Sequence, residues 1–286
     1  RAEPHTAADA FRRLPELREV ESVGRALALY LPGRRFVSIR GRSISMRRPL
    51  DIDFLGEVLP GRRFTEPRRR GKYLLFDLEP TGTLLNHLGM SGRLILTDAS
   101  ADVATHTHLT LDLDDGRELR FVDPRRFGLM VWLEPGDEAT DSSLARLGIE
   151  QLQSSLEHEL PPLLKARRAP LKSLLLDQRL VAGVGNIYAV EALWRAGIRP
   201  SRAGSRTSMR RLARLAVEVR AVLEEAVEQG GTTIRDYATP DGNFGYFAVH
   251  LQAYGRQGNP CERCGATLRA DVIGGRTTAW CRGCQR

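Results

Sequence analysis

The stretch KYLLFDLEPTGTLLNHLGMSGRLILT, residues 72–97, decides the fold of the first half of this chain. It contains three short apolar runs, at 72–79, 83–88 and 92–97, which are separated by turns that contain Gly or Pro. Four similar runs lie around it, at 35–46, 108–114, 118–123 and 128–133. Short, closely spaced runs of this kind are typical of antiparallel strands. They predict a β-sandwich or a β-barrel.

Helices are expected on both sides of these strands. Val23, Leu27 and Leu31 recur at helical spacing, so a helix is predicted from about Val20 onward. After the strands the pattern becomes helical in five segments, at 144–149, 155–167, 170–178, 186–198 and 208–230. We therefore expect an α+β protein, in which an antiparallel β-sandwich with a flanking helix precedes a helical domain that begins near residues 140 to 155.

Close to the end of the chain, four cysteines follow the pattern C-x2-C-x16-C-x2-C: Cys261, Cys264, Cys281 and Cys284. The short spacing lets two thiolates from one tight turn reach a single tetrahedral zinc, and the longer gap fits a hairpin that returns the second pair. Gly265 and Gly283 stand where the two turns are expected to need a positive φ. Two disulfides are the alternative, which a cytoplasmic setting disfavours. Four thiolates leave no open coordination position, so one structural zinc is expected.

The charge of the chain favours a nucleic-acid partner. Its 286 residues carry a formal net charge of +8, and of its 43 basic residues all but Lys72, Lys165 and Lys172 are arginines. The planar guanidinium fork suits bidentate phosphate contacts, and clustered arginines are typical of nucleic-acid binding. An acidic protein partner is the alternative. The arginine clusters lie at 62–72, 202–214 and 256–286, and each one alone is also consistent with a solvated surface.

The sequence predicts no membrane segment. It has no run of eighteen apolar residues, and its most apolar stretch, 180–194, contains Asn186 and Glu191. The first fourteen residues lack the apolar segment of a secretory signal. We therefore expect a cytoplasmic protein with no membrane partner.

Seven motifs occur in an order that resembles one known family. They are PELREVES (15–22), GKYLLF (71–76), HLGMSG (87–92), DPRRFG (123–128), VAGVGNIYAVEAL (181–193), GGTTIRDY (230–237) and YGRQGNPCERCG (254–265). From Leu14 to Arg286 the chain resembles formamidopyrimidine-DNA glycosylase, the bacterial base-excision repair enzyme for oxidised purines. The resemblance implies a monomeric DNA glycosylase and AP lyase that acts on double-stranded DNA containing oxidised bases. It also implies a catalytic β-sandwich at 15–140, a helix-two-turn-helix DNA-binding domain with a base-capping loop at 141–248, and a zinc finger at 249–286.

The resemblance assigns the chemistry to Pro15 and Glu16. In the family a free N-terminal proline amine attacks C1′ of the damaged nucleotide, and the adjacent glutamate acts as general acid and base on the sugar. A secondary amine forms an iminium that has no N–H to lose, so it stays cationic and draws electrons for β- and δ-elimination. Glu19 matches a second, supporting glutamate. Without the resemblance, a proline and acids that open a helix would be the simpler interpretation.

The resemblance also implies a set of DNA contacts. Phosphates around the extruded nucleotide are contacted by five residues: Lys72, His87, Asn186, Tyr254 and Arg276. Of these, Lys72 and Arg276 also belong to the catalytic set, and Lys72 is the nearest alternative amine by motif. Arg235, in the capping loop at 230–247, occupies the position of a base-contacting basic residue.

Three residues match the family's wedge, which fills the gap that an extruded base leaves in the stack: Met90, Arg125 and Phe127. Composition alone would make Met90 and Phe127 core residues. The glycines around them, Gly89, Gly92 and Gly128, favour exposed turns instead.

Two features depart from the family pattern. Arg18 stands where the family usually has a proline between two glutamates. More important, residues 1–14 precede Pro15, and an acylated proline nitrogen has no nucleophilic lone pair. A start at Leu14, with the initiating residue trimmed, would give an active chain that begins at Pro15. The alternatives are an endonuclease VIII-like glycosylase for oxidised pyrimidines and, if the extension is retained, a non-catalytic zinc-ribbon DNA-binding protein.

Overall fold

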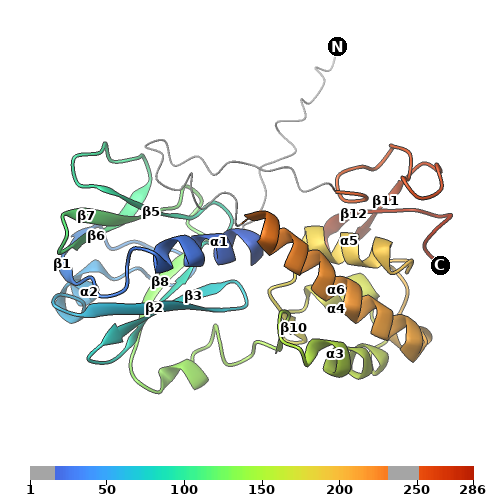
Figure 1. Ribbon diagram of the computed structural model, residues 1–286, viewed down its shortest axis with the longest axis horizontal. Helices are drawn as coiled ribbons and strands as arrows, with labels where there is room; N and C mark the ends of the chain where they lie inside the picture. Colours follow the sequence, from blue (N-terminus) through green and yellow to red (C-terminus); the bar gives the residue numbers. More distant parts are fainter. Residues whose placement is uncertain (1–16, 231–250) are drawn as a thin grey trace, which may run out of the picture. The chain divides into compact units, whose positions relative to one another are not determined.

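The computed structural model describes residues 17–230 and 251–286 (Figure 1). The described residues divide into two compact units, unit 1 with residues 17–145 and unit 2 with residues 146–229 and 251–286. Helices and strands both contribute substantially, which confirms the α+β class. Pro15, Glu16 and Arg235 lie outside the described residues.

Unit 1 is an antiparallel β-sandwich, as the strand pattern predicts. One sheet has the order β1-β6-β7-β5, formed by β1 (Phe36–Gly41), β6 (Thr107–Leu113), β7 (Arg117–Val122) and β5 (Arg93–Asp98). The other has the order β2-β3-β4-β8, formed by β2 (Arg63–Arg70), β3 (Tyr73–Glu79), β4 (Thr83–His87) and β8 (Leu129–Leu133). Apolar side chains of both sheets and of the predicted first helix, α1 (Leu17–Ala28), meet in one core that includes Leu27, Phe76 and Phe121.

The structure corrects the predicted elements in three places. β2 is a strand where the sequence indicated only an arginine cluster, and it lies at a sheet edge, where a proline such as Pro67 is tolerated. The short helix α2 (Ile52–Val58) is additional, and Asp51 caps its first turn by accepting from Phe54 N at 3.0 Å. Residues 144–149 form no helix, since they make a turn and then enter the short strand β9 (Ile149–Glu150).

Unit 2 is helical and ends in a hairpin. Its elements are α3 (Leu156–Lys165), α4 (Leu171–Leu176), β10 (Val181–Ala182) paired with β9, α5 (Asn186–Arg195), α6 (Met209–Gly230) and the hairpin strands β11 (Arg269–Ile273) and β12 (Arg276–Trp280). Eight of the ten residues of α5 are buried, so this helix is the centre of the unit. Among the described residues, no helix combines the length and the apolar character that crossing a membrane requires.

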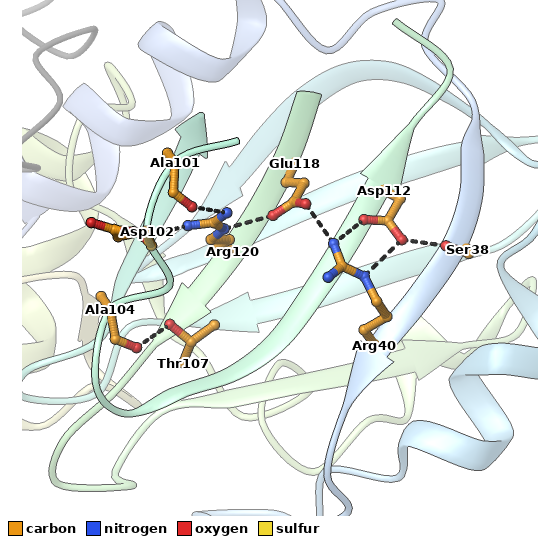
Figure 2. A network of polar contacts seen from close by, with 9 residues as sticks. All are labelled: Ser38, Arg40, Ala101, Asp102, Ala104, Thr107, Asp112, Glu118 and Arg120. Atoms are coloured by element: carbon orange, nitrogen blue, oxygen red, sulfur yellow. Dashed lines mark hydrogen bonds and ion pairs between the residues drawn. The ribbon is translucent and has the colours of Figure 1, made fainter. Parts of the chain in front are cut away.

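A ladder of charged side chains crosses the β1-β6-β7 sheet (Figure 2). Arg40 lies between the carboxylates of Asp112 and Glu118, and Arg120 bonds the second oxygen of Glu118 at 2.7 Å. Arg120 also donates to the carbonyl oxygens of Ala101 and Asp102. Glu118 and Arg120 are only 2% and 3% exposed. Glu118 and Arg120 therefore replace their lost hydration with hydrogen bonds. Those of Arg120 join the sheet to the connection between β5 and β6.

Replacing Glu118 by Gln tests how much this ladder contributes to the free energy of unfolding. The variant leaves the buried guanidinium of Arg120 without its counter-charge, so the free energy of unfolding should fall by about 3–5 kcal/mol in urea denaturation. Glu138→Gln is the matched control, because its ion pair with Arg68 is exposed and should contribute less than about 1 kcal/mol. Equal losses in both variants would contradict the assignment.

Candidate functional site

The β2-β3-β4 meander of unit 1 brings Lys72 and His87 together. Lys72 lies in the turn between β2 and β3 and directly precedes Tyr73. In the β3-β4 register Tyr73 is paired with His87, and their ring centroids are 4.6 Å apart. The fold thus places a lysine and a partly exposed histidine at the same end of one hairpin.

The ring of His87 is neutral and its tautomer is set by a hydrogen bond. Nδ1 accepts the backbone N–H of Gly89 at 2.8 Å, which places the ring proton on Nε2. Burial, helped by the positive charges of Arg47 and Lys72, lowers the pKa of His87 to about 3. His87 can therefore donate one hydrogen bond from Nε2 to an anion, while Lys72 supplies positive charge.

The turn after β4 and the turn before β8 pack directly against each other. Gly89 has a φ of 68°, and a Cβ on it would lie only 2.3 Å from the carbonyl carbon of Phe127. The buried carboxylate of Asp123 ties the two turns together, since it accepts from Ser91 Oγ at 2.6 Å and from Gly128 N at 2.8 Å. The predicted wedge residues of both turns therefore lie in one rigid assembly.

The wedge candidates are on the surface of this assembly. Phe127 is 46% exposed, which excludes the interpretation of this ring as a core residue. The guanidinium of Arg125 lies 5.0 Å from the Phe127 ring centroid, and Met90, in the facing turn, is partly exposed. Exposed apolar side chains held by buried polar bonds suit insertion into a base stack.

In unit 2, Asn186 and Arg276 are joined through the hairpin. Asn186 begins α5, and its Nδ2 donates to the carbonyl oxygen of Thr277 at 3.3 Å. Its Oδ1 is buried and has no hydrogen-bond partner within the described ranges 17–230 and 251–286. The exposed Arg276 opens β12, next to Thr277. A helix N-terminus and an exposed arginine in one place suit an anionic ligand. The unpaired Oδ1 is an acceptor, so it would bond a donor and not the anion.

Lys172 holds the tip of this hairpin, and nothing in the sequence indicated this role. Its fully buried ammonium donates to the carbonyl oxygens of Ile273 and Arg276, at 3.4 and 3.2 Å, and also to Thr278 Oγ1. Burial, together with the charge of Arg276, lowers its pKa to about 8. Lys172 therefore positions the backbone from which Arg276 projects.

Glu191 positions the backbone segment that carries Tyr254, as Lys172 does for Arg276. The carboxylate is buried in α5 and accepts three successive backbone N–H groups, those of Gln252, Ala253 and Tyr254, at 3.1, 2.9 and 2.7 Å. Ala253 is fully buried and packs with Val190 in the core beside the cysteines. One helix, α5, thus anchors both the hairpin and the segment that carries Tyr254.

The four cysteines converge as their spacing predicts. Their sulfur atoms all lie within 4.8 Å of one another, with 3.5 Å between Cys264 and Cys281 and 4.0 Å between Cys261 and Cys284. Four ligands at the usual Zn–S distance of about 2.3 Å stand ~3.8 Å apart in a tetrahedron. All four thiols are free of disulfides. The donor set therefore fits one structural zinc and excludes the disulfide alternative.

The two glycines of the cysteine turns have different roles. Gly265 has a φ of 74°, as expected. Gly283 does not have a positive φ, so that expectation was wrong. A Cβ on Gly283 would lie 3.2 Å from the sulfur of Cys264, which means that this position needs a small residue for space.

The first arginine cluster is not a phosphate-binding patch as a whole. Arg68 is paired with Asp77 and Glu138, and Arg69 is paired with Glu21 at 2.6 Å. Arg62 stacks on the ring of Trp132 at 4.6 Å and donates to backbone oxygens. These side chains bond to other residues of the sandwich, so only part of the positive charge counted in the sequence can bind a ligand.

Three predicted site residues have no described position. Pro15 and Glu16 precede the first described residue, and Arg235 lies between residues 230 and 251. The other candidates are grouped by the fold into the unit 1 cluster of Lys72, His87 and the wedge, and the unit 2 cluster of Asn186, Tyr254 and Arg276.

Three domain families match the chain in sequence order. They are the formamidopyrimidine-DNA glycosylase N-terminal domain over residues 14–130, the formamidopyrimidine-DNA glycosylase H2TH domain over residues 147–238, and the zinc finger found in FPG and IleRS over residues 258–286. The chain belongs to the formamidopyrimidine-DNA glycosylase family. This confirms the resemblance that the motifs indicated.

Full-length relatives agree with the family assignment. The formamidopyrimidine-DNA glycosylases of Xanthomonas campestris pv. campestris (strain B100) and Xanthomonas axonopodis pv. citri (strain 306) are each 44% identical over 274 residues, which is 96% of this chain and 100% of theirs.

Solved structures of the family are similar over nearly the whole chain. The crystal structure of the MutM (Fpg) protein from Thermus thermophilus has a TM-score of 0.81 at 41% identity, covering 95% of this chain and 98% of that one. Lactococcus lactis Fpg in complex with DNA containing N7-benzyl-Fapy-dG has a TM-score of 0.85 at 31% identity, covering 95% and 100%.

Removing one cysteine tests the zinc site. Cys264→Ser replaces a thiolate with a weak ligand, so the protein should lose most of its zinc in elemental analysis and bind DNA more weakly, because the hairpin that carries Arg276 loses its clamp. Arg282→Ser, an exposed position within the second cysteine turn, should keep one zinc per chain. Folded, DNA-binding wild-type protein without zinc would refute the site.

The protonation state of His87 predicts a pH dependence of stability. Its pKa falls from about 6.5 when unfolded to about 3 when folded, so the unfolded chain binds the extra proton. The contribution of His87 to stability is complete above about pH 6.5 and is lost as the pH falls toward 3. Unfolding free energies should therefore drop less between pH 7 and pH 5 in His87→Gln than in the wild type or in His158→Gln, an exposed control. An NMR titration of the His87 ring with a midpoint near 6.5 would contradict this.

Proposed function

We propose that this chain is a DNA glycosylase with AP-lyase activity that removes oxidised purines from double-stranded DNA. The observation that carries the proposal is the packing of the turns 88–92 and 123–128 in the same unit and on the same sheet end as Lys72 and His87. Candidate wedge residues and candidate phosphate ligands thus occur in one rigid assembly.

The arrangement suits extrusion of a nucleotide. An enzyme that acts on a base inside a duplex must unstack it and hold the distorted backbone. Met90 and Phe127 can fill the vacated stack, while Arg125 can bond the orphaned partner base. Lys72 and a neutral His87 with its proton on Nε2 can bind the phosphates of the extruded nucleotide.

The chemistry at the sugar belongs to Pro15 and Glu16 in this proposal. The lone pair of the Pro15 nitrogen forms a bond to C1′ and the bond between C1′ and the base breaks. The base leaves with its electron pair and takes up the proton that the proline nitrogen loses. Glu16 then protonates O4′ as the sugar ring opens, which leaves a cationic iminium between the proline and C1′.

The iminium drives strand cleavage. It acidifies the C2′ proton, and the loss of that proton expels the 3′ phosphate by β-elimination. A second elimination releases the 5′ phosphate, and water returns the proline amine. Because the first step needs a free amine, we propose that the active form begins at Pro15 and that residues 1–14 are absent from it.

The proposed substrate class is the oxidised purine, with 8-oxoguanine and formamidopyrimidines as its members. Arg235 and the amides of the 230–247 segment would contact the extruded base. A second candidate is an oxidised pyrimidine, and one observation favours it: a structure of the Lactococcus lactis enzyme contains DNA with an oxidised pyrimidine. We further propose that the protein acts as a monomer, since one chain carries every candidate site residue. We propose the cytoplasm as its location because its proposed substrate is double-stranded DNA.

Borohydride trapping tests the nucleophile. A chain that begins at Pro15 should form a covalent protein–DNA adduct on duplex containing 8-oxoguanine, and peptide mapping should place the adduct on Pro15. Glu16→Gln on the same chain keeps the amine but removes the proton transfer at the sugar, which should slow excision by ~10²–10⁴-fold.

The chain with residues 1–14 retained is the matched control. Its Pro15 nitrogen is an amide, so it should neither trap nor excise, although it should still bind DNA. Full activity with the extension intact would rule out the proline amine, and Lys72 would then be the residue to map. Binding without any trapping in the trimmed chain would instead favour a non-catalytic DNA-binding protein.

A further inference from the structure

The connection between β1 and α2 forms a closed loop with Arg47 near its tip. Ile44 and Leu50 form an isolated antiparallel bridge, in which each backbone N–H donates to the other carbonyl oxygen, at 3.2 and 3.0 Å. Leu50 is buried, and Ile44 and Met46 pack against the sandwich core. The loop is therefore fixed at its base and at one side, and it presents the exposed Arg47 to solvent.

Contacts at the tip place Arg47 beside both parts of the unit 1 cluster. Its backbone N–H donates to the carbonyl oxygen of Gly128, in the wedge turn, at 3.3 Å. Its guanidinium carbon lies 6.0 Å from the ring centroid of Tyr73, the ring that packs on His87. The same positive charge contributes, with that of Lys72, to the low pKa of His87.

The neighbouring arginine behaves differently. Arg48 donates to the carboxylate of Asp141 at 2.6 Å, and that carboxylate is only 5% exposed, so the charge of Arg48 is compensated. Among residues 17–230 and 251–286, Arg47 has no acidic partner. Two adjacent arginines of one loop therefore differ in whether a counter-charge is already present.

The positive charge of Arg47 suits an anionic ligand. The charges of Arg47 and Lys72 both disfavour protonation of His87, and no acidic side chain pairs with Arg47 in the described part of the chain. An exposed arginine without a counter-charge is available to an anionic ligand, which would supply the opposite charge. A guanidinium fork on a rigid loop matches a phosphate in both charge and geometry.

We propose that Arg47 is a further DNA-binding residue, which contacts a backbone phosphate next to the one bound by Lys72 and His87. The inference rests on the proposed DNA-binding role of that cluster. Because the loop is also bonded to the wedge turn through Gly128, the contact fixes the strand at the point where the wedge enters.

The salt dependence of DNA affinity tests this contact. The affinity for a duplex containing a tetrahydrofuran abasic-site analogue is measured by fluorescence anisotropy between about 50 and 200 mM salt. Arg47→Ala should weaken binding and should reduce the slope of log affinity against log salt by about 0.9, the value for one lost phosphate contact. Arg47→Lys should keep the wild-type slope, since it keeps the charge, with an affinity between the other two.

Arg48→Ala is the matched control, because it removes the same formal charge from the adjacent position. Its slope should equal that of the wild type, with folding of each variant checked by thermal unfolding. The inference about Arg47 is wrong if Arg47→Ala and the wild type have equal slopes. It is also wrong if Arg47→Ala and Arg48→Ala change the slope equally. Neither result contradicts the proposed function. A wild-type protein that does not prefer the abasic duplex over an undamaged one overturns the proposed function as well.

Discussion

Three surface segments of this protein are each held by hydrogen bonds between their backbone and one buried ionisable side chain. Asp123 holds the wedge turn, Lys172 holds the hairpin tip before Arg276, and Glu191 holds the segment that carries Tyr254. A buried charge without such partners costs several kcal/mol, so each segment has one strongly preferred conformation. Segments that are ordered before they bind lose less conformational entropy when DNA arrives.

The positions of the acidic side chains decide which arginines can bind DNA phosphates. Many arginines of the described residues are used internally, as in the pairs of Arg68 with Asp77 and of Arg69 with Glu21. Others, such as Arg120, are also buried, in this case against Glu118 of the same strand. A net charge of +8 therefore overstates the number of candidate phosphate ligands. Within the described residues, Arg47 beside the unit 1 cluster and Arg276 at the start of β12 are two arginines without an acidic partner.

The neutral state of His87 is consistent with this distribution of charge. A third cation near Lys72 and Arg47 would add repulsion, whereas a neutral ring with its proton on Nε2 adds a directed donor without adding charge. The hydrogen bond from Gly89 sets this tautomer, and the absence of a Cβ on Gly89 lets its turn lie against Gly128. One glycine thus contributes both to the phosphate cluster and to the wedge assembly.

The sequence by itself determined the α+β class, the strand-rich first half, the zinc-binding cysteines and, through seven motifs, the family. These follow from local information, namely the period of apolar residues, turn residues and short fixed spacings. Only the tertiary structure decided the sheet order, the strand character of β2, and the anchoring roles of Asp123, Lys172 and Glu191. Those depend on contacts such as that of Lys172 with Thr278, which lie far apart in the chain. Periodicity reports which residues share a face, but partners across such distances are chosen by packing and by the need to satisfy buried charges.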